Sequence, residues 1–252
     1  ANAFLRSLTK RSASTRFIEV PESNNRVTLR YHSDTRRSER LWGGVPGWSW
    51  QELGALVIDL DVIYVNFISG FEMDLATATA LRTGFDGPIY VDFHSLMLGL
   101  DPDGDRRPRP LSNLAHWLGC FDCIQVNDVE MSLMGSNPME VAATAFAHGV
   151  RLVVVTMGER GAAYFTQRPL DLFNHQRSAG PIETALIPTE QVDRGDPTGC
   201  GDVFGAGLVA QLVRPVDLET AIRTANALAG RNLQSRGATN LHYALKGEIA
   251  PN

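Results

Sequence analysis

Residues 123–155 read CIQVNDVEMSLMGSNPMEVAATAFAHGVRLVVV and predict a strand, a helix and a second strand. The two ends, residues 123–126 and 152–155, are short and mostly apolar, which is typical of buried strands. Between them, Asn137 can cap a helix that has Pro138 at its first position and Gly149 just past its end. This order, with continuous apolar strands, favours a parallel sheet covered on both faces.

The same alternation extends back to residue 50. We expect strands over 62–67 and 89–91, and helices over 50–56, 73–82 and 111–118. After residue 155 the pattern changes, and residues 157–165 predict a hairpin at an edge of the sheet. Further on we expect a strand over 185–187 and helices over 201–212 and 218–233. Residues 101–110 read DPDGDRRPRP, a composition that predicts a loop.

The chain has 252 residues, enough for one large α/β domain or one domain with a small appendage. Residues 26–31 alternate between polar and apolar and predict a strand with one covered face, followed by a polar stretch. We therefore assign 1–14 and 50–252 to an α/β domain, and 15–49 to a β-rich segment that projects from it.

The composition excludes several classes of partner. The net charge of −5 provides no basic field for nucleic acid. No apolar run reaches the roughly 20 residues of a membrane span, and no signal peptide is visible. Three cysteines indicate a reducing compartment, and Cys120 and Cys123 are expected to be buried thiols rather than half of a metal site. We therefore expect a cytoplasmic protein that binds neither nucleic acid nor a membrane.

Residues 196–202 read DPTGCGD and carry the strongest chemical signal. The glycines on either side of Cys200 let the backbone approach a ligand, and the free N–H groups of the helix that follows favour an anion. Asp202 in the same turn would repel a phosphate unless it has a role, such as accepting a proton from a hydroxyl that attacks phosphorus. The turn therefore predicts phosphoryl transfer.

This turn has three other possible interpretations. Asp202 can simply complement the helix dipole while the glycines pack closely. A dinucleotide-binding turn would directly follow a first apolar strand and have an acidic residue about 20 positions later. Here residues 193–197, near the end of the chain, precede the turn instead. A P-loop needs a Gly-x-x-x-x-Gly-Lys sequence, which is absent.

Three segments, in the right order, resemble the ribokinase-like (pfkB-type) carbohydrate kinases. Residues 196–207 are similar to the C-terminal signature of that family, residues 127–130 to its Asn-x-x-Glu motif, and residues 156–161 to its nucleotide-phosphate turn. The resemblance implies a three-layer α/β/α fold with a mostly parallel central sheet and a small β-rich lid, formed by residues 15–49. It also implies an ATP-dependent phosphotransferase that acts on a hydroxyl of a sugar, a nucleoside or a related small molecule.

The resemblance further implies roles for individual residues. Asp202 would be the base, and the N–H groups of residues 199–201 would form an anion hole. Glu130, with Asn127, would organise Mg²⁺ through waters, and Asp196 would lie near a K⁺ site. Thr156, Gly158 and Gly161 would contact the ATP phosphates, and Asn226 would flank the adenine. Gly199, Cys200 and Gly201 would support catalysis.

Each auxiliary motif also has an ordinary structural explanation. Asn127 and Glu130 match a capping box at a helix start, and residues 156–161 match a common hairpin turn. Asn66, Asp92 and His94 lie at strand ends, where α/β sheets place ligands, and they are the candidate substrate contacts. The family often has Asp-x-Asn where this chain has Asp92-x-His94, and Asn66 can equally cap its strand.

Full-length members of the family begin with a strand that carries a substrate-binding Asp, followed by a Gly-Gly-Asn segment. Neither is visible, so we expect the chain to start inside the family's pattern, with an exposed sheet edge. That edge, or the lid, could form a homodimer. A second hypothesis follows: a kinase-fold protein without catalysis that acts as a regulatory or scaffolding partner. The intact Asp202 and its flanking glycines argue against it.

Overall fold

The computed structural model describes residues 21–32, 37–173, 180–190, 195–234 and 241–246. Predictions for residues 1–14 lie outside this part of the chain. The main sheet has six strands in the order β10-β9-β8-β7-β4-β3. Four run parallel: β3 (Ile63–Asn66), β4 (Ile89–Asp92), β7 (Cys123–Asn127) and β8 (Leu152–Thr156). Beyond them, β9 (Ala162–Gln167) pairs antiparallel with β8, and β10 (Ile182–Ile187) pairs antiparallel with β9. The sheet is thus mostly parallel, as predicted.

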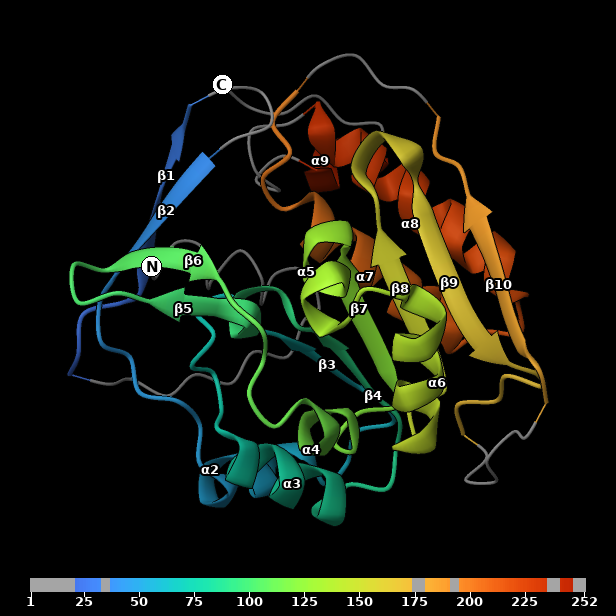
Figure 1. Ribbon diagram of the computed structural model, residues 1–252, viewed down its shortest axis with the longest axis horizontal. Coiled ribbons are helices and arrows are strands. Elements are labelled where there is room, and N and C mark those ends of the chain that lie inside the picture. Colours follow the sequence, from blue (N-terminus) through green and yellow to red (C-terminus); the bar gives the residue numbers. More distant parts are fainter. Residues whose placement is uncertain (1–20, 33–36, 174–179, 191–194, 235–240, 247–252) are drawn as a thin grey trace.

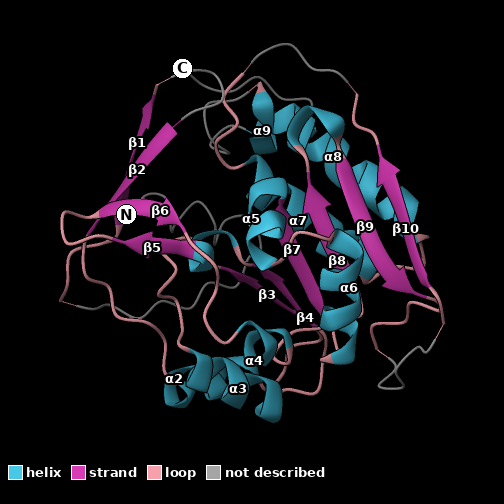
Figure 2. Cartoon of the chain, in the orientation of Figure 1, coloured by secondary structure: helices cyan, strands magenta, loops and turns pink. Residues whose placement is uncertain are grey.

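Helices cover both faces of this sheet (Figures 1 and 2). One face carries α2 (Trp50–Val57), α3 (Leu75–Gly84), α4 (Leu114–Leu118), α5 (Asp128–Met134) and α6 (Pro138–Ala147). The other carries α7 (Cys200–Leu212) and α8 (Leu218–Leu233), with the short α9 (Leu241–Lys246) beside α8. The result is the predicted three-layer α/β/α arrangement.

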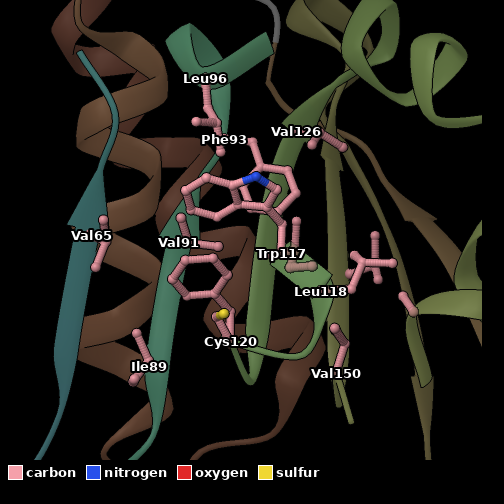
Figure 3. Packing of buried hydrophobic residues seen from close by; sticks show 14 of the residues in the cluster. Val65, Ile89, Val91, Phe93, Leu96, Trp117, Leu118, Cys120, Val126 and Val150 are labelled. Carbon is pink, nitrogen blue, oxygen red and sulfur yellow. The ribbon is translucent and has the colours of Figure 1, made fainter. Parts of the chain in front are cut away.

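Two hydrophobic cores follow from the alternation of side chains along the parallel strands. Val91 and Val126 point to the core with α3, α4 and α6, where Trp117 and Leu118 of α4 pack against them (Figure 3). Tyr90 of β4, Cys123 of β7 and Val154 of β8 point to the opposite core, under α7 and α8. Because the helices cover both faces, the parallel strands carry apolar side chains on both.

A second, antiparallel sheet has the order β1-β2-β6-β5. It combines β1 (Arg26–Tyr31) and β2 (Arg37–Trp42) with β5 (Leu98–Leu100) and β6 (Asp105–Pro108). The prediction of a loop over 101–110 is therefore wrong for its second half. Composition missed β6 because it is held by tertiary contacts: the buried guanidinium of Arg106 donates to the carbonyls of Ile68, Ser69 and Ser95.

Several local predictions can be compared directly with the structure. Asn137 caps α6, accepting from the Met139 N–H at 3.0 Å, as predicted. The predicted hairpin forms through η2 (Gly158–Arg160), but β10 pairs with β9, so the hairpin is not at the sheet edge. Cys120 and Cys123 are buried and free, as expected. None of the helices in the described ranges is both long and apolar enough to cross a membrane.

Candidate active site

Polar side chains form one row across the carboxyl ends of three adjacent parallel strands. The strand register places Asn66 of β3 beside Asp92 of β4, and Asp92 beside Gln125 of β7. The first turn of α7, which carries Gly201 and Asp202, contacts this row. In parallel α/β sheets, ligands bind outside the carboxyl ends of the strands. The predicted base and two predicted substrate residues thus meet where the fold favours a ligand.

The start of α7 is shaped for an anion. Gly199 caps the helix in the left-handed region, at φ 80°, which glycine adopts without strain. Among the described residues, the N–H groups of Gly199 and Gly201 have no hydrogen-bond acceptor, whereas the Cys200 N–H donates to Pro197 O at 3.1 Å. Two of the three N–H groups predicted for the anion hole are therefore available, and they add to the positive end of the helix dipole.

The Asp202 side chain is exposed at this turn and tied to β3. Asn66 Nδ2 donates to Asp202 Oδ1 at 2.5 Å. This donation fixes the amide orientation, so Asn66 Oδ1 faces away from Asp202, and it is buried without a partner among the described residues. A buried acceptor without a donor is costly, so this oxygen is a local cost of the arrangement.

A chain of hydrogen bonds joins the other predicted residues. Asp92 Oδ1 accepts from the His94 backbone N–H at 3.2 Å, and His94 Nδ1 lies 3.0 Å from Glu130 Oε1. Because a carboxylate accepts, Nδ1 carries the proton of this hydrogen bond. Asn127 Nδ2 donates to the same Glu130 oxygen at 2.6 Å. The structure thus brings Asp92, His94, Glu130 and Asn127 into one network.

Asn127 and Glu130 also form the capping box that the sequence offers as their ordinary explanation. Asn127 Oδ1 accepts from the Glu130 N–H at 2.9 Å, and Glu130 Oε2 accepts from the Asn127 N–H at 2.8 Å. Both oxygens of this buried carboxylate are therefore occupied. Glu130 suits the ordering of water around a cation better than direct coordination.

The described residues supply only part of a metal coordination shell. They contain no group of three His, Cys, Asp or Glu side chains arranged to hold an ion. Such a partial set is compatible with Mg²⁺, which is usually held by one or two carboxylates together with phosphates and water. Asp196, the predicted neighbour of K⁺, accepts from the Thr198 N–H at 2.9 Å. Both cation assignments stay predictions.

The electrostatics of the network are unusual at Asp92 and His94. Burial, together with the charges of Glu130 and Asp202, raises the pKa of Asp92 to about 7, although His94 opposes the rise. At His94, burial works against the charged form. The hydrogen bond and charge of Glu130, with the charges of Asp92 and Glu39, outweigh that effect and raise the pKa of the imidazole. Both groups retain protons more strongly in the folded protein than in the unfolded chain.

These two shifts predict how stability depends on pH. Asp92 holds extra protons in the folded state between about pH 4 and pH 7, and His94 does so above its ordinary pKa of 6.5. When the folded state binds more protons, the free energy of unfolding falls as the pH rises. Urea unfolding should therefore give a lower stability at about pH 8 than at about pH 5.

The variant Asp92→Asn isolates the Asp92 contribution to this effect, because its amide does not titrate. Its stability should decline less than that of the wild type between about pH 5 and pH 7. Equal slopes for the two proteins in that interval would contradict the assignment.

The predicted nucleotide residues lie at the end of the sheet nearest β10. Gly158 is exposed, and a Cβ there would meet no atom within 4 Å, so its surroundings are open. Gly161 is buried, and a Cβ there would lie 2.1 Å from Ile187 O. Asn226 of α8 donates to the same carbonyl at 3.0 Å. Thr156 Oγ1 lies 3.4 Å from Val126 O. Nucleotide contacts for these four residues stay predictions.

Two residues of the site were missed by the sequence analysis. Gln125 links Asp92 to the Gly201 carbonyl. The hydroxyl of Tyr64 is buried against Gly205 without a hydrogen-bond partner in the described part of the chain. Gln125 could have been found in the sequence, because it is the polar residue of the otherwise apolar run CIQV. A buried glutamine needs hydrogen-bond partners. The small residues Gly205, Ala206 and Gly207 indicate that α7 packs closely against a neighbour, but nothing in the sequence identifies that neighbour as Tyr64.

Comparisons with known proteins agree with this geometry. The model of a family described as pfkB family carbohydrate kinase matches residues 96–243, more than half of the chain. A ribokinase of Arabidopsis thaliana is 32% identical over an alignment of 128 positions, which covers 48% of this chain and 31% of that protein. This chain thus matches only about a third of that relative's length.

Solved structures share the fold. A ribokinase from Thermotoga maritima superposes with a TM-score of 0.71 and 16% identity, covering 95% of this chain and 73% of its own. A nucleoside kinase of Burkholderia thailandensis in complex with inosine gives 0.69 and 18%, covering 99% of this chain and 78% of its own. At these identities the likeness concerns the fold, and the predicted ribokinase-like fold is confirmed.

Proposed function

The chain belongs to the pfkB family of carbohydrate kinases. From this premise we propose that it transfers the γ-phosphoryl group of ATP to a hydroxyl of a sugar, a nucleoside or a related small molecule. The observation that carries the proposal is the exposed Asp202 carboxylate in the same helical turn as the available N–H groups of Gly199 and Gly201. This arrangement combines a proton acceptor with an anion site, and phosphoryl transfer needs both.

In the proposed reaction Asp202 accepts the proton of the substrate hydroxyl as its oxygen attacks phosphorus. Asn66 holds the carboxylate through its 2.5 Å donation. Asp92 and His94, next to Asn66 along the sheet edge, would contact the remainder of the acceptor. These residues position the hydroxyl before the reaction, which lowers the entropic barrier.

The start of α7 stabilises the negative charge of the transferring group through its N–H donors and helix dipole. Asn127 and Glu130 would organise Mg²⁺ through waters, and that ion, when bound, neutralises phosphate charge. Thr156, Gly158, Gly161 and Asn226 would bind the nucleotide, with Asp196 near K⁺.

The second sheet would act as a lid, and this sheet or the edge of the main sheet would mediate a homodimer. We further propose that the enzyme acts in the cytoplasm.

A screen for ADP release tests the proposal. The chain is incubated with ATP and Mg²⁺ and a panel of sugars and nucleosides, each compared with a reaction that lacks the acceptor. We expect acceptor-dependent ADP from one chemical class, accompanied by the phosphorylated alcohol. ADP release that no member of the panel raises above the acceptor-free rate would contradict the proposal.

A further inference from the structure

Gln125 occupies the third position of the polar row beneath α7. It lies in β7 in register with Asp92, which is itself in register with Asn66. Its side chain is 2% exposed, in a strand whose neighbouring residues Ile124 and Val126 belong to the opposite core. A polar side chain at such a position is held only if its hydrogen bonds are made.

Three hydrogen bonds fix the Gln125 amide in one orientation. Its Nε2 donates to Asp92 Oδ2 at 2.6 Å and to Gly201 O at 3.1 Å, and its Oε1 accepts from the Tyr90 hydroxyl at 2.9 Å. The reverse orientation would direct the amide oxygen at two acceptors, so the partners determine which atom is nitrogen. Gln125 is thereby a rigid link between β4, β7 and α7.

The helix rests directly on this link. A Cβ at Gly205 would lie 2.8 Å from Gln125 Oε1, and one at Gly201 would lie 3.8 Å from Gln125 Nε2. The two glycines are one helical turn apart, so the same face of α7 meets Gln125 twice. The absence of a side chain at Gly205 lets α7 lie close enough for the Gly201 carbonyl to reach the Gln125 amide.

The two ends of the row hold Asp202 in complementary ways. Asn66 holds the carboxylate itself, and Gln125 holds the carbonyl of Gly201, which belongs to the peptide group leading into Asp202. The first contact orients the side chain and the second its backbone. Because a displacement of about 1 Å at a reacting group can cost about 100-fold in rate, both contacts bear on turnover.

We propose that Gln125 is a positioning residue, which fixes the first turn of α7, and with it the Asp202 carboxylate, to Asp92 at the carboxyl ends of β4 and β7. This inference rests on the proposed function, since it concerns the residue that accepts the proton. Gln125 does not touch the substrate. It acts through the Gly201 carbonyl and through Asp92.

Two substitutions with side chains of similar length distinguish the hydrogen-bond donor of Gln125 from the space that its side chain fills. Gln125→Met keeps much of the volume and removes both donations, and Gln125→Lys keeps a donor that can reach Asp92 and Gly201 O. We expect Gln125→Met to lower kcat about 10- to 100-fold, with the KM for ATP changed less than about threefold. Gln125→Lys should recover at least part of the lost kcat.

Tyr90→Phe is the matched control, since it removes the third hydrogen bond of Gln125 and leaves both donations in place. Its kcat should stay within about threefold of the wild type. Hydrogen exchange provides a readout independent of catalysis. Amides of residues 200–206 should exchange faster in Gln125→Met than in Tyr90→Phe, because only the former releases the Gly201 carbonyl.

The outcomes distinguish this inference from the proposed function. An inactive wild type would contradict the proposed function, while the exchange comparison would still test the link to α7. An active wild type with unchanged kcat in Gln125→Met would overturn the inference alone. An equal loss of kcat in Gln125→Met and Gln125→Lys would also overturn the inference, and so would unchanged hydrogen exchange at residues 200–206. Either result is expected if the Gln125 side chain only fills space.

Discussion

Asp202→Asn should lower kcat by about 100- to 10,000-fold, the range that a general base contributes. The amide keeps the size of the side chain but accepts a proton poorly, so the substrate hydroxyl loses its proton acceptor. The change leaves the N–H groups of Gly199 and Gly201 in place. Nucleotide binding should therefore stay within about threefold of the wild type, and steady-state kinetics with calorimetric titration of ATP would measure both quantities.

Asp217→Asn is the matched control for this prediction. Asp217 is also a carboxylate at the start of a helix, where it caps α8 by accepting from the Thr220 N–H at 2.9 Å. Asparagine is an equally good cap, so neither stability nor kcat should change. If Asp202→Asn turned over as fast as this control, Asp202 would not be the base.

Gly205→Ala should have the second largest effect, through the packing of α7 on the sheet. The new Cβ would lie 2.3 Å from the Tyr64 hydroxyl oxygen and 2.8 Å from Gln125 Oε1. Tyr64 has little room to retreat, because its ring packs edge-on against Tyr90 at 5.4 Å. The helix must therefore move, and Asp202 moves with it. We expect kcat to fall by about 100-fold and the free energy of unfolding by about 1–3 kcal/mol.

Gly201→Ala tests whether the steric contact is the cause. It is the same substitution one turn earlier in α7, but outside its own helix its Cβ would meet no atom of the described residues closer than 3.8 Å. Its stability should equal the wild type or exceed it by up to about 1 kcal/mol, since alanine favours helix more than glycine. Adding Tyr64→Phe to Gly205→Ala should restore part of the lost stability. Wild-type stability in Gly205→Ala, measured by urea unfolding, would disprove the contact.

The fold was predictable where local signals and burial agree. The apolar β8 and the capped α6 were both recognised, because Asn137, Pro138 and Gly149 mark the ends of that helix. Strand β6 was missed because Asp, Gly and Pro dominate its surroundings, and its place depends on carbonyls that Arg106 reaches across the fold. Such contacts have no local pattern.

The residue types of the candidate site were visible in the sequence, but the contacts between these residues were not. Asp202 and its glycines form a contiguous motif, so their place together at the start of a helix could be predicted from the sequence. The contact of Asp202 with Asn66 joins residues 136 positions apart, and no pattern in one sequence encodes such a pair. Gln125 is intermediate: its polarity in an apolar strand was visible, while its partners follow only from the strand register.

Direct detection of the phosphorylated product is the measurement closest to the central claim that Asp202 and the start of α7 transfer a phosphoryl group to an alcohol. Phosphorus NMR of the chain with ATP, Mg²⁺ and the sugar and nucleoside panel would follow donor and product together. We predict a phosphomonoester signal that grows in step with ADP and is lost in Asp202→Asn. ATP that stays intact, or that yields only inorganic phosphate with every acceptor, would contradict the account.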